Sequence, residues 1–217
     1  MNNQILLIFD LDFTLIDNSE GIINSFNYSL TSHGHQKLSP TEIIPMIGIP
    51  LEKMFSKYVK NDVNIYVKSF REYYSQKGIR ELKLLPGTKE KISELKKLNY
   101  NLAILTSKKE ELARILIKNL QLDEYFNIVL GSTNERKMKN SPLLKTILAD
   151  KFKNIKKYVV IGDHRSDGEV SEMLKCPFIG LLTGKSTKDD LMTSTPMKKV
   201  VLNDIRELNS KIILDLF

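Results

Sequence analysis

The sequence predicts an α/β fold, a doubly wound parallel sheet with an inserted all-helical domain, and three observations lead to it. Short apolar runs bounded by turn residues recur along the chain, as in strands that are covered on both faces of a parallel sheet. Segments with apolar residues at helical spacing alternate with the later runs, which is typical of strand–helix–strand units. One long stretch, residues 18–82, carries helix signals but no convincing strand, so the insert is expected there.

The apolar runs predict six strands. The first spans residues 5–9, and the later runs span residues 102–105, 128–130, 158–161, 178–182 and 200–202. Helices are expected between the later strands, and the segment 203–217 is expected to close the chain as one helix.

The same pattern predicts the division of the chain into domains. Residues 1–17 and 83–217 form the predicted α/β core, and residues 18–82 form the predicted helical cap domain. Within the insert, Gly34 and Gly78 lie between helix-like segments, as expected for the turns of a small helical bundle.

Composition and charge argue against several classes of protein. The chain has 217 residues and a net charge of +7, but its lysines are scattered over helix-like segments, so no nucleic-acid partner is expected. A single cysteine, Cys176, excludes an internal disulfide framework and a cysteine-rich zinc site. The apolar run near the N-terminus is too short for a membrane span and has no basic leader, so we expect a cytoplasmic protein without a membrane partner.

Polar and reactive side chains stand where three of the predicted strands end. They are Asp10 and Asp12 after the first strand, Thr106 and Ser107 after the second, and Asp163 and Asp167 after the fourth. One acid or hydroxyl at a strand end commonly caps a helix or makes a turn. Three such strand ends favour a ligand site, because ligands of open α/β sheets bind at the carboxyl ends of the strands.

The carboxylates of Asp10, Asp163 and Asp167 are expected to converge at this edge. Crowded carboxylates repel one another unless a cation lies between them, and a set of oxygen ligands suits Mg²⁺ better than zinc. Because Mg²⁺ in such sites usually works with a phosphate group, hydroxyl donors and a lysine are expected nearby. The segment after the third strand offers Arg136, Lys137 and Lys139.

These motifs resemble those of the haloacid dehalogenase-like phosphohydrolase superfamily. The four matching stretches are "IFDLDFTLID", "ILTS", "KNSP" with Lys139, and "VVIGDHRSD". The helical insert between the first and second motifs is similar to that of the subgroup resembling phosphoglycolate phosphatase and β-phosphoglucomutase. The resemblance implies a Rossmann-like core of the haloacid dehalogenase type with a helical cap that selects the substrate.

The resemblance also implies a mechanism. Asp10 would be the nucleophile that forms an aspartyl-phosphate, and Asp12 would be the general acid and base. The cofactor would be Mg²⁺, with metal ligands Asp10, Asp12, Asp163 and Asp167 and phosphate-binding residues Thr106, Ser107 and Lys139. The implied function is a Mg²⁺-dependent phosphatase of a small phosphorylated metabolite, such as a phosphoglycolate-like compound, a sugar or nucleotide monophosphate, or pyrophosphate.

The sequence departs from the family pattern at a few positions. Phe13 stands where the family usually has glycine, and His164 replaces a small residue beside Asp163. Asn140 follows Lys139 where proline is usual, so Lys137 competes with Lys139 for the third motif.

Two alternative functions stay open at this stage. A phosphomutase of the β-phosphoglucomutase type shares all four motifs but has to shield the aspartyl-phosphate from water. A binding or regulatory member of the fold would need no catalysis, although every acid that the chemistry requires is present. The substrate, the cap residues that select it and the oligomeric state do not follow from the sequence.

Overall fold

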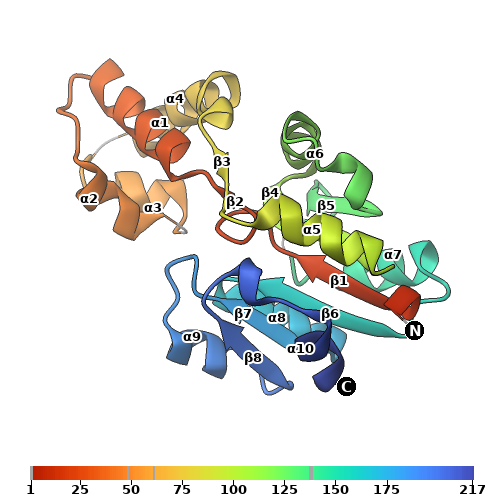
Figure 1. Ribbon diagram of the computed structural model, residues 1–217. Helices are drawn as coiled ribbons and strands as arrows, with labels where there is room; N and C mark the ends of the chain where they lie inside the picture. Colours follow the sequence, from red (N-terminus) through yellow and green to blue (C-terminus); the bar gives the residue numbers. More distant parts are fainter. Residues whose placement is uncertain (1, 48, 61, 137–138) are drawn as a thin grey trace. The chain divides into compact units, whose positions relative to one another are not determined.

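The computed structural model describes residues 2–47, 49–60, 62–136 and 139–217 (Figure 1). The chain divides into two compact units, Met1–Ile16 with Leu84–Phe217 and Asp17–Lys83. The chain passes from one unit to the other at β2 (Ile16–Asp17) and β3 (Lys83–Leu84), which form a two-stranded sheet. Within the described ranges, no helix is both long enough and apolar enough to be a membrane span.

The larger unit contains a six-stranded sheet in the order β5-β4-β1-β6-β7-β8, in which the neighbouring strands run parallel. The strands are β1 (Ile5–Phe9), β4 (Asn101–Lys109), β5 (Ile128–Ser132), β6 (Lys157–Gly162), β7 (Phe178–Leu181) and β8 (Lys199–Leu202). The side chains of β1 are all buried, as expected for a strand covered on both faces. The α/β fold predicted from the apolar runs is therefore confirmed.

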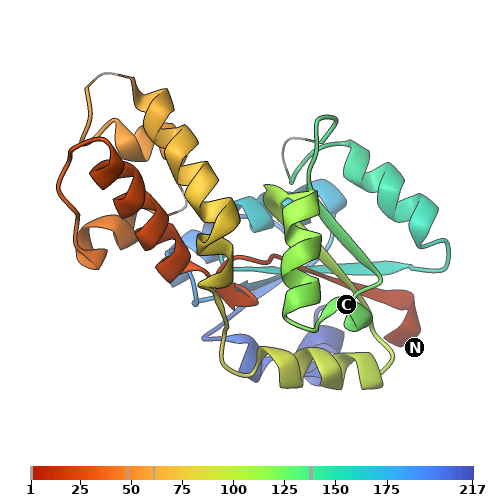
Figure 2. The same cartoon turned by 90° about the horizontal axis from the view of Figure 1, so that it is seen from above.

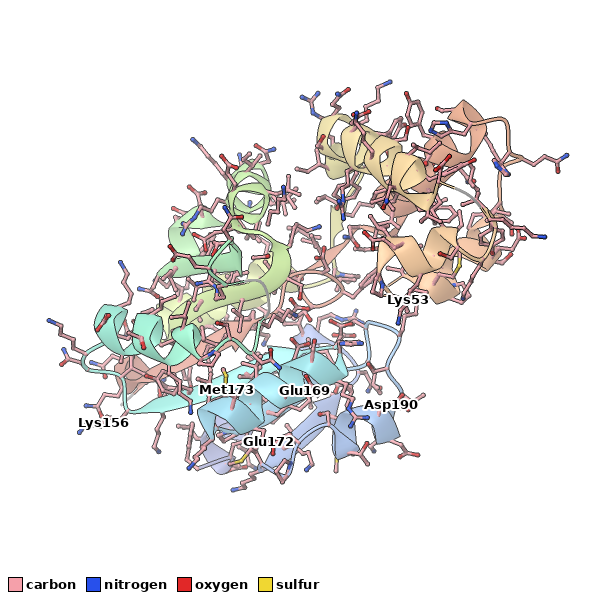
Figure 3. The ribbon with its side chains drawn as sticks, turned by 180° about the vertical axis from the view of Figure 1, so that it is seen from behind. Lys53, Lys156, Glu169, Glu172, Met173 and Asp190 are labelled. Carbon is pink, nitrogen blue, oxygen red and sulfur yellow. The ribbon has the colours of Figure 1, made fainter. Side chains whose placement is uncertain are left out.

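Helices cover both faces of this sheet (Figures 1 and 2). One face carries α5 (Thr88–Lys97), α6 (Glu110–Asn119) and α10 (Ser210–Asp215), and the other carries α7 (Leu143–Lys151), α8 (Arg165–Leu174) and α9 (Lys188–Thr193). Figure 3 views the second face, where Glu169 and Glu172 of α8 are exposed while Met173 packs against the core. Cys176 is buried in that core. Short 3₁₀ helices span Asn2–Gln4, Asp123–Tyr125 and Ile205–Glu207.

The prediction of one helix over residues 203–217 is wrong. The structure has the 3₁₀ helix Ile205–Glu207 and then α10, separated by Asn209 in an extended conformation with φ −150°. The Asn209 side chain accepts a hydrogen bond of 3.0 Å from the Ile212 amide, so it caps a new helix. Capping by asparagine outweighs continuation of the apolar period here.

The smaller unit is built from helices around an aromatic core. Its helices are α1 (Ser19–Ser32), α2 (Pro40–Ile43), α3 (Leu51–Phe55) and α4 (Val63–Gln76), with 3₁₀ helices Ile44–Met46 and Gly78–Arg80. The rings of Phe26 and Phe55 stack with centroids 4.2 Å apart, and Phe70 packs edge-on against Phe55. Aromatic pairs of this kind add to the stabilisation from burial.

Candidate active site

Asp10 follows directly after β1, a central strand of the sheet. Its backbone amide donates a hydrogen bond of 2.9 Å to the Ile161 carbonyl, which continues the pairing of β1 with β6 past the end of the strand. The Asp10 side chain is buried. The first strand therefore ends on a buried carboxyl group whose backbone is held by the neighbouring strand.

Three carboxylates from two neighbouring strand ends converge here. Each of Asp10, Asp163 and Asp167 has an oxygen within 4.8 Å of an oxygen of the others, and all three side chains are buried. Asp163 follows β6, and Asp167 lies in the first turn of α8, where its Oδ2 accepts a hydrogen bond of 3.1 Å from the His164 amide. The structure thus brings together the three carboxylates that the sequence places at these strand ends.

Lys139 lies within this cluster. Its Nζ is 2.7 Å from Asp10 Oδ1 and 2.8 Å from Asp167 Oδ1, and the lysine side chain is only 6% exposed. Asp10 Oδ1 makes this ion pair, but it has no well-aligned hydrogen bond among the described residues. Lys137, the competing candidate for the third motif, lies outside the described residues.

Arg136, another basic candidate near the third motif, lies elsewhere. Its guanidinium group is buried and binds Glu110 Oε2 at 2.7 Å and the Gly131 carbonyl at 2.6 Å. Burial alone raises the pKa of Glu110, but hydrogen bonds from Arg114 and the Gly131 amide outweigh it and leave that pKa below its ordinary value. This pair ties the start of α6 to the segment after β5 and is not part of the carboxylate cluster.

The cluster contains three buried carboxyl groups and the ammonium group of Lys139. Burial raises the pKa of Asp10 well above its ordinary value, in spite of the opposing effect of Lys139. Burial, followed by the charge of Asp167, raises the pKa of Asp163 to about 7. Burial lowers the pKa of Lys139, but the carboxylates of Asp10 and Asp167 outweigh that effect and raise it above the ordinary value. One ammonium group therefore does not balance three buried carboxylates.

These residues fit a hard divalent cation. The donor set is made only of oxygens, the carboxylates are close enough to share one ion, and Asp10 Oδ1 has a buried acceptor position to offer. Two glycines permit the packing, because a β-carbon at Gly162 would overlap with Asp167 and one at Gly184 would overlap with Asp163.

Asp12 and the residues of the second motif lie in the same unit. Asp12 is half-buried, and its Oδ1 is 3.4 Å from Lys108 Nζ. Thr106 is buried and its Oγ1 accepts a hydrogen bond of 3.2 Å from the Lys108 amide, whereas Ser107 is exposed. Asp12 is also near enough to Asp10 for its charge to act on that carboxyl group.

Phe13 occupies the position that is usually glycine in this motif, and it adopts the conformation that glycine favours. Its φ is +58°, in the left-handed region, which costs a residue with a side chain about 1–2 kcal/mol. The turn holds it there, because the Phe13 amide donates to the Ile16 carbonyl at 2.7 Å and the Thr183 hydroxyl donates to the Phe13 carbonyl. Phe13 therefore adopts the left-handed backbone conformation that glycine favours, although it carries a side chain.

His164 is exposed and caps a helix. Its Nδ1 accepts a hydrogen bond of 3.2 Å from the Ser166 amide at the start of α8. The histidine beside Asp163 thus has a structural partner of its own.

Several residues around the cluster were not predicted from the sequence. The Thr14 hydroxyl donates a hydrogen bond of 2.9 Å to Asp163 Oδ1, and Lys108 pairs with Asp12. The turn after β7 brings Thr183 to Phe13 and Gly184 to Asp163. Strand alternation gave no usable signal for Lys108, because this residue lies where the pairing of β4 with β5 shifts register. A turn after the fifth strand carries no such signal either.

The fold and the site together define an α/β protein with a lysine-bridged carboxylate cluster at the carboxyl ends of parallel strands. The chain belongs to the haloacid dehalogenase-like hydrolase family, whose model matches residues 7–181. It is 34% identical over 143 residues to a putative pyrophosphatase PpaX of Caldanaerobacter subterraneus, covering 65% of each chain. The match therefore spans just under two thirds of that relative's length.

Further similarities extend over more of the chain. It is 28% identical over 172 residues to a phosphoglycolate phosphatase of Aquifex aeolicus, covering 77% of this chain and 79% of that one. Among solved structures, it matches a putative phosphatase from Clostridium difficile over 100% of both chains, with a TM-score of 0.84 and 30% identity. A haloacid dehalogenase-like protein from Streptococcus pneumoniae matches over 100% of both chains, with a TM-score of 0.83 and 26% identity.

Proposed function

We propose that this protein is a Mg²⁺-dependent phosphatase that hydrolyses a small phosphorylated metabolite through an aspartyl-phosphate on Asp10. The observation that carries the proposal is the buried cluster in which Lys139 bridges Asp10 and Asp167 beside Asp163. It combines a carboxylate at a fixed strand end with a cation site and a buried ammonium group. Phosphoryl transfer requires this combination, because its catalysis consists mostly of placement and charge stabilisation.

In the first step, a carboxylate oxygen of Asp10 attacks phosphorus, and the bond from phosphorus to the leaving oxygen breaks. The leaving oxygen takes a proton from Asp12, so an alcohol or an acid departs rather than its anion. The product on the protein is an aspartyl-phosphate.

In the second step, water attacks the phosphorus of the aspartyl-phosphate and Asp12 takes one of its protons. The bond from phosphorus to the Asp10 oxygen breaks, inorganic phosphate leaves, and both carboxyl groups return to their starting states. The Thr106 hydroxyl, the Ser107 amide and Lys139 would bind the phosphoryl oxygens.

The side chains of Asp10, Asp163 and Asp167 and the backbone carbonyl of Asp12 would hold Mg²⁺. A bound Mg²⁺ would offset the charge of the carboxylates and of the phosphoryl oxygens. The raised pKa values of Asp10 and Asp163 support this assignment, because one ammonium group does not offset the burial of three carboxyl groups.

The substrate class is proposed from the relatives. The names of the similar proteins point to pyrophosphate and phosphoglycolate, and sugar and nucleotide monophosphates belong in the same test. In each of these compounds the phosphoryl group is bonded to an oxygen atom, and proton transfer to that oxygen assists its departure.

Phosphate release by the purified protein tests the proposal. The substrates are p-nitrophenyl phosphate, pyrophosphate, phosphoglycolate, and sugar and nucleotide monophosphates, each with Mg²⁺ and with EDTA. We expect turnover with Mg²⁺ only, and its absence across the panel would contradict the proposed function.

Single substitutions test the roles. Asp10→Asn should abolish turnover and Asp12→Asn should nearly do so, whereas Asp150→Asn, at an exposed position of α7, should leave it unchanged. Mass spectrometry after acid quenching should find the phosphoryl group on Asp10. Near wild-type rates for Asp10→Asn would show that the nucleophile is assigned wrongly.

A further inference from the structure

Lys108 lies beside the acid that serves the leaving oxygen in the proposed mechanism. Its Nζ is 3.4 Å from Asp12 Oδ1, and its side chain is 10% exposed, against 26% for Asp12. A lysine ammonium is seldom this far removed from water unless it has a partner of opposite charge. The pair is therefore partly buried and more constrained than an ion pair on the surface.

The strand β4 delivers Lys108 to this position. Ile104 of β4 is in register with Phe9, the last residue of β1, so β4 continues to Lys109 beyond the end of β1. The pairing of β4 with β5 shifts register between Leu105 and Lys109, as at a β-bulge. Such irregularities re-aim side chains at the rim of a sheet.

Lys108 is also tied to the second motif. Its amide donates a hydrogen bond of 3.2 Å to Thr106 Oγ1, which ties the two residues together in the irregular part of β4. One short segment thus carries a hydroxyl expected to bind the phosphoryl group and an ammonium group paired with the expected acid.

We propose that Lys108 is a positioning residue for Asp12, which fixes the orientation of its carboxyl group for proton transfer to the leaving oxygen. This inference rests on the proposed function. Holding such a group in reacting geometry lowers the barrier, because its orientational entropy is lost before the reaction.

If Lys108 acts through Asp12, the effect of replacing it on the rate depends on the leaving group of the substrate. A weakly acidic leaving group needs the proton from Asp12, whereas p-nitrophenolate departs with little help. A lysine that acts through Asp12 therefore matters more for phenyl phosphate than for p-nitrophenyl phosphate. A lysine that only binds the phosphoryl group, or only stabilises the fold, affects both substrates equally.

The experiment measures kcat/KM with Mg²⁺ for aryl phosphates from p-nitrophenyl phosphate to phenyl phosphate. This constant reports the steps through cleavage of the leaving group, so hydrolysis of the aspartyl-phosphate does not mask them. The variants are Lys108→Met, Lys108→Gln as a second neutral variant should the first not fold, and Lys108→Arg. Lys109→Met is the matched control, since Lys109 is the exposed neighbour.

General acid catalysis contributes about 10²–10⁴-fold, so Lys108→Met should lower kcat/KM for phenyl phosphate by about tenfold or more. For p-nitrophenyl phosphate kcat/KM should fall by less than about threefold, because its leaving group needs little general acid catalysis. Lys108→Arg should recover most of the phenyl phosphate rate, and Lys109→Met should match the wild type with both substrates.

Equal losses with all the aryl phosphates, or no loss with any, would overturn the positioning role while leaving the proposed function standing. If the wild-type protein hydrolyses none of the aryl phosphates and none of the metabolites named above, the proposed function fails, and this inference fails with it.

Discussion

Lys139→Met tests the charge balance of the cluster through stability rather than activity. Lys139 Nζ contacts Asp10 and Asp167 at 2.7 and 2.8 Å from a position that is only 6% exposed. At an effective dielectric constant of about 20, each contact is worth roughly 6 kcal/mol before desolvation is counted. Removal of one partner of a buried ion pair costs about 3–5 kcal/mol overall, so we expect the unfolding free energy of the metal-free protein to fall by that amount.

The assay is urea unfolding in EDTA at pH 8, followed by circular dichroism. Lys145→Met, an exposed position of α7, is the matched control and should change the unfolding free energy by less than about 0.5 kcal/mol. Excess Mg²⁺ should stabilise Lys139→Met more than the wild type, because the cation then replaces a lost ammonium group and meets no repulsion from it.

Two results would refute this reasoning. One is a metal-free Lys139→Met protein within about 0.5 kcal/mol of the wild type, which is the range of an ordinary surface substitution. The other is an equal gain from Mg²⁺ in both proteins. Either would mean that Lys139 is not the positive charge that keeps the carboxylates together.

Three further predictions concern the surroundings of the site. Gly184→Ala places a β-carbon against Asp163 and should weaken Mg²⁺ binding at least about tenfold by calorimetry, and unchanged affinity would contradict the packing argument. Glu110→Gln removes the counter-charge of buried Arg136 and should destabilise the protein by about 2 kcal/mol at pH 7. The pKa of Glu110 is lower in the folded protein than in the unfolded chain. The extra stability of the wild type over Glu110→Gln should therefore be present above the unfolded pKa and disappear as the pH falls through the folded pKa. A difference in unfolding free energy that stays constant from pH 7 to about 3 in urea would refute this. Burial raises the pKa of Cys176 to about 12, so a thiol reagent should label it at least about 100-fold more slowly in buffer than in urea, and equal rates would contradict its burial.

The sheet was predictable because the apolar runs are short, continuous and bounded by turn residues, and strands covered on both faces have these properties. The end of the chain was less predictable. Its apolar period continues through Asn209, but the asparagine side chain caps a new helix there. Local hydrogen bonding of this kind decides helix boundaries, and periodicity does not report it.

For the site, the positions of acids and hydroxyls at strand ends predicted which residues to consider, because parallel strands end at one edge. Their catalytic roles remain predictions. The contacts of Lys108, Thr14 and Gly184 could not be predicted from the sequence, because each depends on how far a strand or turn projects beyond its neighbours. The burial of Arg136 with Glu110 likewise depends on the path of the segment after β5.

The central position of β1 has a consequence for hydrogen exchange. The side chains of β1 are at most 2% exposed, the strand pairs with β4 and β6, and the Asp10 amide is bonded to Ile161. Amides in such a strand exchange only when the whole unit opens. Lys139 instead comes from the segment after β5, an edge strand of the sheet. Its position beside Asp10 therefore depends on its ion pairs with Asp10 and Asp167 and not on strand pairing.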